Sequence, residues 1–372
     1  MDIEKQLEII KRGAVEIISE AQLKKKLEES RKNKRPLIVK AGFDPTAPDI
    51  HLGHTVLLRK LRQFQDLGHQ VIFLIGDFTA RIGDPTGRSE KRKQLAKDEV
   101  VRNAATYKKQ VSKILDLDKL KIVFNSEWFE KMPVLDILNL TTHATVSQML
   151  ARADFKKRLS KNEDISLLEF MYPLLQGYDS VILKADIELG GTDQIFNLLV
   201  GRDIQQDLGE AQQVVITMPL LVGTDGAQKM SKSFGNYIGI NEPPSEIFGK
   251  IMSIPDELMW RYYQLLLLKT PAQIADLQDQ VKNNKKHPMD LKKELAFGIV
   301  SRFWSAAEAQ ESQKQFELLF QQKDSNAAAE FVLDTAHNEL KLLDLIKLLE
   351  PALSMTQIRR LITDGAISIN DA

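Results

Sequence analysis

Two histidines, His51 and His54, follow a Gly-Phe-Asp-Pro-Thr segment and flank a leucine and a glycine. On a helix, residues at i and i+3 lie on one face. Three interpretations therefore compete: a pair of metal ligands, an ordinary polar helix start, or donors to a phosphate at a helix N-terminus. A metal site needs a third protein ligand, and no HExxH-type carboxylate stands at the right spacing. These four residues alone do not decide between the other two.

The residues around this pair would suit a nucleotide crevice. In an open α/β sheet, ligands bind outside the carboxyl ends of the strands, where helix N-termini point. Asp44, Pro45 and Thr46 would form a rigid turn that carries a carboxylate and a hydroxyl into such a crevice. Gly53 would let an adenine or a ribose lie flat against the backbone.

A second motif, GTDGAQKMSKSFGN, spans residues 223–236. Taken alone, its two lysines, Lys229 and Lys232, are typical of a solvated surface loop. The functional alternative is a mobile clamp that neutralises polyphosphate charge once ATP has bound, with the glycines as hinges. Two ammonium groups on long flexible stems suit this task.

A third cluster places Tyr172, Gln176 and Asp179 at i, i+4 and i+7, so that on a helix they face the same way. Buried polar side chains need hydrogen-bond partners, so this face is either a polar binding surface or a solvated stripe. The GGTDQ segment at residues 190–194 then offers backbone freedom, followed by two polar side chains at the start of the next helix.

The elements that must position these motifs alternate between strand and helix over the first two-thirds of the chain. This order predicts an α/β fold with a Rossmann-like, doubly wound parallel sheet. The predicted strands are apolar runs at residues 36–43, 70–77, 120–125 and 214–223. A helical insertion at about residues 126–185 is predicted to separate the two halves of the sheet.

Strand signals vanish near residue 240, which divides the chain into three predicted domains. The Rossmann-like domain covers residues 1–238, and an all-α domain follows over residues 239–335. Residues 336–372 are predicted to form a linker and the start of a small α/β module, with Ser354 capping a helix and a strand beginning at AISIN. A lone strand cannot bury itself, so this module is predicted to be incomplete.

The composition is that of a globular protein and excludes several classes. The chain has 372 residues with 51 basic and 51 acidic side chains, so net charge points to no anionic partner. It has no cysteine, which excludes disulfides, thiolate metal sites and a cysteine nucleophile. It shows neither a signal-peptide pattern nor an apolar run of about 20 residues, so we expect a cytoplasmic protein that does not span a membrane.

Together, HLGH and KMSKS resemble the paired HIGH and KMSKS motifs of the class I aminoacyl-tRNA synthetases. The second motif, Lys229 to Ser233, matches in every letter, and the first differs only at Leu52. With AGFDPT, IGDPTG and the cluster from Tyr172 to Gln194, the chain resembles the bacterial tyrosyl-tRNA synthetases from about residue 30 onward. The resemblance implies an ATP-dependent ligase that joins tyrosine to tRNA. It also implies a homodimer, Mg²⁺ that accompanies ATP, no metal bound by the protein, and an anticodon-binding role for the helical domain.

The resemblance implies a role for each candidate residue. The phenol hydroxyl of tyrosine would bind Asp179, and Gln194 would lie near the substrate carboxylate. The substrate ammonium group would be held by Asp84, Tyr172 and Gln176. The ATP-binding residues would be Asp44, Gly53, Gly191, Asp193, Lys229, Met230, Ser231, Lys232 and Ser233, with Asp193 on the ribose. The residues that act in catalysis would be His51, His54, Thr46, Lys229 and Lys232, and Arg88 and Arg92 would lie near the departing pyrophosphate.

Three positions depart from the family pattern. Many members have a tyrosine, which touches the phenol hydroxyl, and a cysteine where this chain has Lys40 and Ala41, and Ile195 stands where others have an aromatic residue. Two rival interpretations remain: a tryptophanyl enzyme, and an RNA-binding relative that has lost the chemistry. The second rival would be expected to show eroded motifs, and here both motifs are intact.

Overall fold

The computed structural model describes residues 2–46, 48–86, 96–321, 341–351, 353–363 and 367. The chain divides into two compact units, Met1–Lys314 and Gln315–Ala372, and each is described by itself. In the part of the chain so described, no helix has the length and apolar character that crossing a membrane requires.

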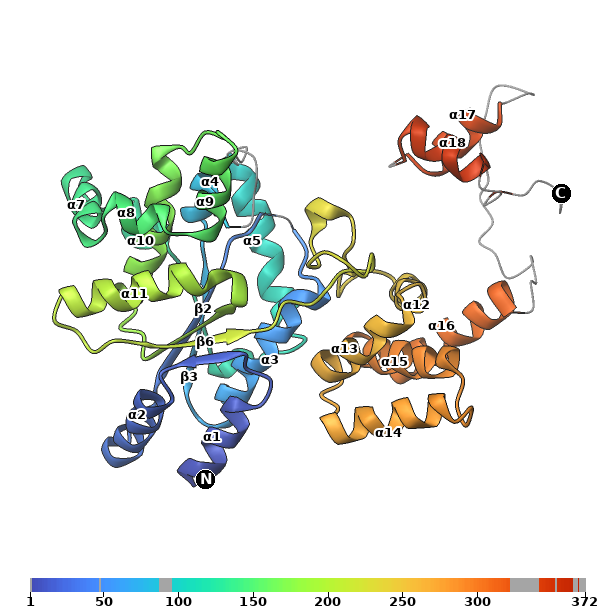
Figure 1. Cartoon of the computed structure of the whole chain (residues 1–372), viewed down its shortest axis with the longest axis horizontal. Coiled ribbons are helices and arrows are strands. Elements are labelled where there is room, and N and C mark those ends of the chain that lie inside the picture. The colour runs from blue at the N-terminus through green and yellow to red at the C-terminus, as the bar shows by residue number, and fades with distance from the viewer. Residues whose placement is uncertain are drawn as a thin grey trace. The chain divides into compact units, whose positions relative to one another are not determined.

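Six strands form one sheet in the first unit (Figure 1). They are β1 (Glu16–Ile18), β2 (Ile38–Phe43), β3 (Gln70–Ile75), β4 (Leu120–Phe124), β5 (Ile187–Gly191) and β6 (Val214–Met218). Their order across the sheet is β1-β6-β5-β2-β3-β4. Only β1 runs antiparallel to its neighbour, and all other neighbours are parallel. The predicted α/β fold class is confirmed.

Two of these strands were not predicted from the sequence. The edge strand β1 has three residues and none is fully buried, so it carries no apolar run. β5 contains Glu188 and ends in two glycines, which are residue types depleted in strands. Because β5 is held between β2 and β6, pairing on both sides overrides its weak intrinsic preference.

Helices cover both faces of the sheet, which is why the central strands are apolar almost throughout. Helix α1 (Ile3–Lys11) precedes the first strand, and α2 (Glu20–Asn33), α3 (Leu52–Asp66), α4 (Thr79–Ile82), α5 (Lys97–Val111) and α11 (Ile195–Asp207) lie between strands along the chain. In Figure 1, α3 and α11 lie on opposite sides of the sheet. α3 is the next helix after β2, and residues 44–51 join the carboxyl end of the strand to the N-terminus of the helix.

Residues 126–182 form the helical insertion. Its helices are α6 (Ser126–Phe129), α7 (Val134–Asn139), α8 (Val146–Leu150), α9 (Ala153–Ser160) and α10 (Leu167–Ile182). α10 packs along α11, and the core between them includes Leu174, Leu175 and Ile204. A capping box of Ser166 and Glu169 fixes the start of α10.

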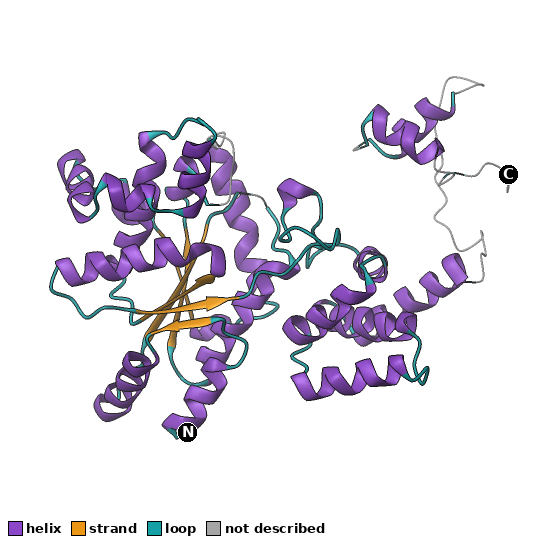
Figure 2. Ribbon diagram, in the orientation of Figure 1, coloured by secondary structure: helices purple, strands orange, loops and turns teal. Residues whose placement is uncertain are grey.

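From Pro244 to Phe316 the chain contains only helices and loops (Figure 2). The helices are α12 (Pro244–Met252), α13 (Asp256–Leu266), α14 (Pro271–Lys282), α15 (Pro288–Phe303) and α16 (Ala306–Phe316). Proline stands at the first position of three of them, where a missing N–H costs nothing. The domain boundaries proposed from the sequence remain predictions.

The described part of the second unit contains a π-helical turn (Glu317–Gln321) and the helices α17 (Leu342–Leu349) and α18 (Met355–Thr363). The Oγ of Ser354 accepts a hydrogen bond from the Gln357 N–H at 3.3 Å, so Ser354 does precede a helix as predicted. The predicted strand AISIN lies outside the described residues except at one position.

Candidate active site

A cavity of about 800 Å³ opens at the carboxyl ends of β2 and β5. Every predicted site residue that the structure describes lines this cavity. These residues are Asp44, Thr46, His51, Gly53, His54, Asp84, Tyr172, Gln176, Asp179, Gly191, Asp193, Gln194, Lys229, Met230, Ser231, Lys232 and Ser233. Arg88 and Arg92 lie outside the described residues. Segments far apart in the sequence thus meet in one place, while their individual roles remain predictions.

The HLGH motif forms the first turn of α3, with His51 as the N-cap residue. The Nδ1 atom of His54 accepts a hydrogen bond from the backbone N–H of His51 at 3.2 Å. Because Nδ1 is an acceptor, the neutral ring carries its proton on Nε2. The two rings lie with their centroids 3.8 Å apart. His54 therefore has one donor, Nε2–H, that this bond leaves for other partners.

Burial keeps both histidines neutral at physiological pH. Burial first, then the charges of His54 and Lys232, hold the pKa of His51 well below its usual value. Burial, with a further contribution from Lys232, lowers the pKa of His54 to about 4. The pair therefore offers hydrogen-bond donors rather than positive charges.

Gly53 is required by the packing of the His51 ring. A Cβ atom at position 53 would lie 3.0 Å from both Cε1 and Nδ1 of that ring. It would also lie 3.6 Å from the Cβ of Met230 in the KMSKS motif. A side chain here would therefore crowd the His51 ring, whereas its distance from Met230 would be an ordinary van der Waals contact.

The loop of the second motif is held by specific contacts at its base. Val222 and Lys229 form a β-bridge, and the buried Asn236 side chain accepts a hydrogen bond from the Ser231 N–H at 2.8 Å. Tyr262 of α13 is fully buried and donates from its hydroxyl to the Val222 carbonyl at 2.9 Å. The base of the loop is therefore anchored on α13 as well as by contacts within the loop.

Both lysines of this loop are paired with carboxylates that face the cavity. The Nζ of Lys229 lies 2.6 Å from Oδ2 of Asp193, and the Nζ of Lys232 lies 2.8 Å from Oδ2 of Asp49. Asp193 is the residue predicted to bind a ribose, and here its carboxylate is paired with Lys229. The two ion pairs connect the loop to carboxylates that line the cavity.

The segment after the loop ties the two motifs together. His51 forms a β-bridge with Gly239, the Leu52 N–H donates to the Ile238 carbonyl at 2.9 Å, and the Ile240 N–H donates to the Ile50 carbonyl at 3.0 Å. A movement of the loop would therefore also move the start of α3, because residues 238–240 after the loop pair with residues 50–52 at the helix start.

Asp179 is buried, with 2% of its surface exposed. Its carboxylate accepts hydrogen bonds from the indole N–H of Trp128 at 3.0 Å and from the Asn125 amide at 3.3 Å. Burial raises the pKa of Asp179 to about 7, opposed chiefly by the positive charge of Lys40. A buried carboxylate that accepts hydrogen bonds from two donors is well suited to accept one more from a ligand hydroxyl.

Other polar groups of the cavity form a second network. The Tyr172 hydroxyl donates to Asp44 at 2.9 Å, and the Gln194 amide donates to Asp84 at 2.8 Å. The Asn197 amide donates to the side chains of Gln176 and Gln194 at 3.1 and 2.9 Å. The carboxylates of Asp44 and Asp84 make this part of the cavity suitable for a cation such as an ammonium group.

Sequence reasoning missed several residues of the site. Asn125 and Trp128 hold Asp179, Asn197 joins the two glutamines, and Asp49 pairs with Lys232. Asn125 was detectable in principle, because a polar residue at the carboxyl end of a parallel strand faces the ligand side of the sheet. The others lie on helices or turns with no distinctive pattern. No group of three or more His, Cys, Asp or Glu side chains in the described part of the chain could hold a metal ion.

Comparison with known proteins agrees with this geometry. A family model described as tRNA synthetases class I (W and Y) matches residues 32–321. The tyrosine–tRNA ligase of Geobacter sulfurreducens is 53% identical over 371 residues, which cover 100% of this chain and 92% of that protein. The corresponding protein of Oleidesulfovibrio alaskensis is 56% identical over 322 residues, covering 87% and 80%. The tyrosyl-tRNA synthetase of Archaeoglobus fulgidus, solved with L-tyrosine, has a TM-score of 0.68 at 27% identity, covering 84% of this chain and 100% of that one.

The chain therefore belongs to the class I tRNA synthetases of the tryptophan and tyrosine group. Within that family it stands with the tyrosine–tRNA ligases, several of which share more than half of its residues over nearly the whole chain. The family, the fold class and the enzyme class predicted from the sequence are thereby confirmed.

Proposed function

We propose that this cavity activates L-tyrosine with ATP and then passes the tyrosyl group to the terminal ribose of tRNA. One observation carries the proposal: a single cavity joins an acceptor for a phenol hydroxyl, carboxylates for an ammonium group, and donors for phosphate oxygens. The names of the relatives support the choice of tyrosine over tryptophan.

Activation is an in-line attack of the tyrosine carboxylate on the α-phosphate of ATP, which yields tyrosyl-adenylate and pyrophosphate. The attacking carboxylate is already ionised at neutral pH, so no general base is needed. Negative charge grows on the phosphoryl oxygens, and preorganised donors stabilise it. The proposed donors are the Nε2–H of His54, the hydroxyl of Thr46 and the two KMSKS lysines, with His51 beside them.

Nucleotide binding would exchange the partners of the two lysines. Phosphate oxygens replace Asp193 and Asp49 as the acceptors of Lys229 and Lys232, which leaves Asp193 available for the ribose hydroxyls. Mg²⁺ enters with ATP as part of the substrate, because this ion is commonly held by phosphates rather than by a protein cage. Arg88 and Arg92 are proposed to meet the departing pyrophosphate.

Tyrosine is distinguished from phenylalanine at Asp179. The phenol hydroxyl donates to the carboxylate, whereas a phenylalanine ring would leave this buried group short of a partner. An unsatisfied buried acceptor of this kind costs on the order of 1–3 kcal/mol, and more when it is charged.

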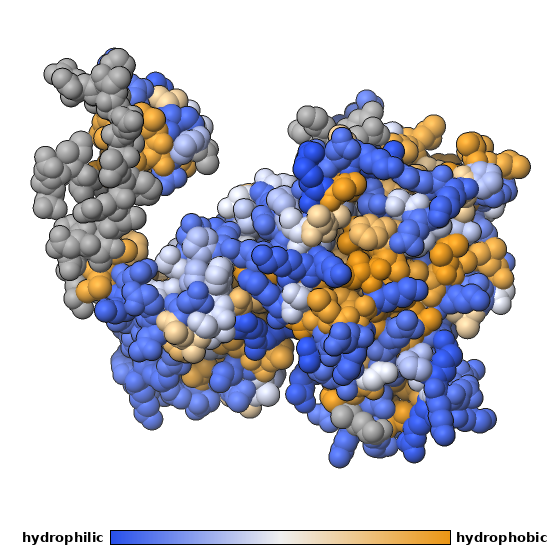
Figure 3. All heavy atoms as spheres, turned by 180° about the vertical axis from the view of Figure 1, so that it is seen from behind, coloured by the Kyte–Doolittle hydropathy of each residue, from blue (hydrophilic) through white to orange (hydrophobic). Residues whose placement is uncertain are grey.

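We also propose that the protein works as a homodimer through the helical insertion. Hydrophobic side chains reach the surface of the first unit (Figure 3). Several of them cluster on α7, α8 and the start of α10, namely Val134, Leu135, Leu138, Val146 and Leu167. A groove lined by Ile82, Ile137, Leu168 and Met171 adjoins them. A contiguous exposed apolar surface of this kind marks a protein interface. The cytoplasmic location remains a prediction.

The test is ATP–pyrophosphate exchange by the purified protein with tyrosine, phenylalanine or tryptophan. We expect exchange with tyrosine and at most a small fraction of that rate with the other two. Equal exchange with tryptophan would contradict the assignment of the substrate. Absence of exchange with every amino acid, in a folded protein that binds ATP, would favour a non-catalytic RNA-binding function.

A further inference from the structure

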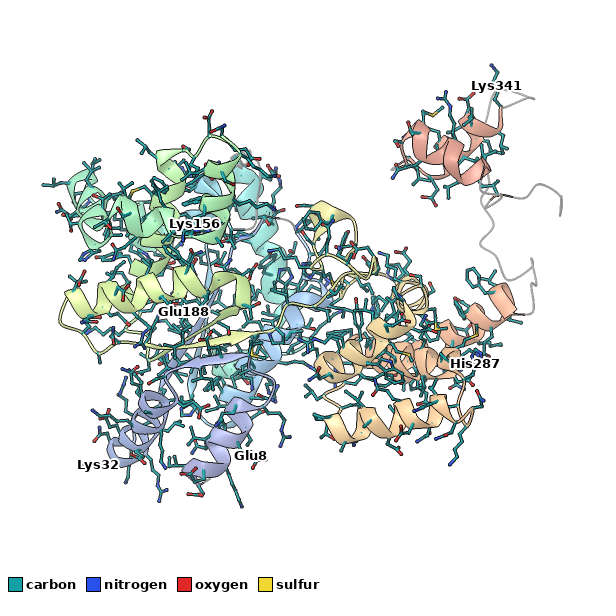
Figure 4. All side chains as sticks on the ribbon, in the orientation of Figure 1. Glu8, Lys32, Lys156, Glu188, His287 and Lys341 are labelled. Carbon is teal, nitrogen blue, oxygen red and sulfur yellow. The ribbon has the colours of Figure 1, made fainter. Side chains whose placement is uncertain are left out.

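A lysine is buried completely inside the sheet. Lys40, in β2, has no exposed surface, and it stands directly opposite Glu188 of β5 in the strand register. The Nζ of Lys40 lies 2.9 Å from Oε1 of Glu188. Glu188, labelled in Figure 4, is 1% exposed. Neither residue is among those that line the cavity.

This ion pair contacts α10 on both sides of Asp179. The Nζ of Lys40 donates to the carbonyl of Gln176 at 3.4 Å, three residues before Asp179. The other carboxylate oxygen of Glu188 accepts from the Ser180 hydroxyl at 3.1 Å, one residue after Asp179. It also accepts from the Gln213 amide. The ion pair therefore contacts the turn of α10 that carries Asp179, the carboxylate proposed to accept the phenol hydroxyl.

The same pair supplies the charges that Asp179 experiences. Lys40 favours its ionised form, and Glu188 disfavours it. Asn125 and Trp128 add uncharged donors. Asn125 also donates to the Thr79 hydroxyl, which in turn donates to Asp44.

Stability alone gives no reason for this arrangement. Two buried charges lose their hydration, and a well-packed apolar pair of similar volume is often as stable or more stable. The presence of this buried ion pair, which contacts the helix of Asp179 from β2 and β5, is better explained by its effect on the position and charge of Asp179.

We propose that Lys40 and Glu188 are positioning residues that fix the orientation and the charge of Asp179, and so control recognition of the tyrosine hydroxyl. The inference rests on the proposed function. It gives the buried Lys40 a role that does not require contact with the substrate, because the lysine acts through Asp179.

The test measures the dissociation constant of tyrosine between pH 5.5 and 8 for Lys40→Met, Glu188→Gln and the double variant. Ionised Asp179 is the better acceptor, so wild-type affinity should fall as the pH drops through about 7, where Asp179 takes up a proton. Lys40→Met should move this midpoint to higher pH, and Glu188→Gln should move it to lower pH. We expect each shift to be about one pH unit, which is about tenfold in affinity on the acidic limb. The double variant should return toward the wild-type midpoint.

Lys60→Met is the matched control. Lys60 is a second buried lysine, 2% exposed, whose Nζ donates to the carbonyls of Ile9, Ile10 and Arg12 away from the cavity lining. Its loss should lower the melting temperature and leave the pH midpoint unchanged. Shifts of the same sign in Lys40→Met and Glu188→Gln, or no shift in either, would overturn the proposal. Failure of the wild-type protein to bind tyrosine would instead contradict the proposed function.

Discussion

At His54, one ring nitrogen supports the fold and the other is the donor proposed for a phosphate. Nδ1 accepts the His51 N–H and so helps to start α3, and His54 is among the residues that line the cavity. The low pKa of this ring, about 4, means that the tautomer persists across the physiological range. One side chain therefore contributes both to the fold and to the proposed chemistry, and the two contributions can be separated by kinetics.

His54→Ala should lower the rate of tyrosine activation by roughly 10²–10³, the usual loss for one preorganised transition-state donor. The dissociation constant of tyrosine should change little, because His54 makes no contact with the Asp179 region. Stopped-flow measurement of adenylate formation and calorimetric titration of tyrosine give the two quantities. An equal loss in rate and affinity would show that His54 acts mainly through the fold.

At the scale of elements, α13 contacts both the base of the KMSKS loop and the neighbouring helix α15. Tyr262 and Tyr263 are adjacent and buried, and both hydroxyls donate to backbone carbonyls. Tyr262 reaches Val222 at the base of the KMSKS loop, whereas Tyr263 reaches Leu291 within the helical domain. The loop also approaches Pro255, the N-cap residue of α13: Gly226 has φ +71, and a Cβ there would lie 2.8 Å from Cγ of Pro255.

Tyr262→Phe should raise the KM for ATP about fivefold, because one neutral hydrogen bond contributes on the order of 1 kcal/mol to the position of the loop. The KM for tyrosine should stay constant. Tyr263→Phe is the control, since it removes an equivalent hydroxyl that does not touch the loop. It should lower stability by a similar amount and leave both KM values unchanged in the exchange assay. The same rise in KM for ATP in both variants would disprove a specific link through Tyr262.

At the scale of the whole molecule, the insertion carries apolar side chains that the described chain does not cover. Leu135 is 67% exposed and Leu167 is 80% exposed. Leu135→Glu should therefore convert a dimer to a monomer at micromolar concentration, as measured by light scattering after gel filtration, because a charge cannot be desolvated cheaply in an interface. Val15→Glu, at a residue that is 58% exposed outside the insertion, should leave the mass unchanged. A wild-type monomer at that concentration would refute the proposed assembly.

The sequence was sufficient where chemistry imposes a local pattern. The histidines, the lysine loop and the Tyr172–Asp179 face were all located, because each is a short motif on one element. β5 was missed because its glutamate and glycines contradict strand propensity, and only its neighbours make it a strand. The partner of Lys40 could not be found either, since it lies across a strand pairing between residues 148 positions apart. Contacts set by tertiary register leave no trace in a short window of sequence.

The strand order has a consequence for synthesis on the ribosome. β1 pairs with β6 alone, so Glu16 cannot form its strand pairing until Thr217 has been synthesised. At 5–20 residues per second, this gap of roughly 200 residues corresponds to about 10–40 s of translation. The pairing of residues 50–52 with residues 238–240 comes later still. The nascent chain therefore carries an unpaired β1 until β6 has been made. The start of α3 lacks its backbone pairing until residues 238–240, which follow the KMSKS loop, have emerged.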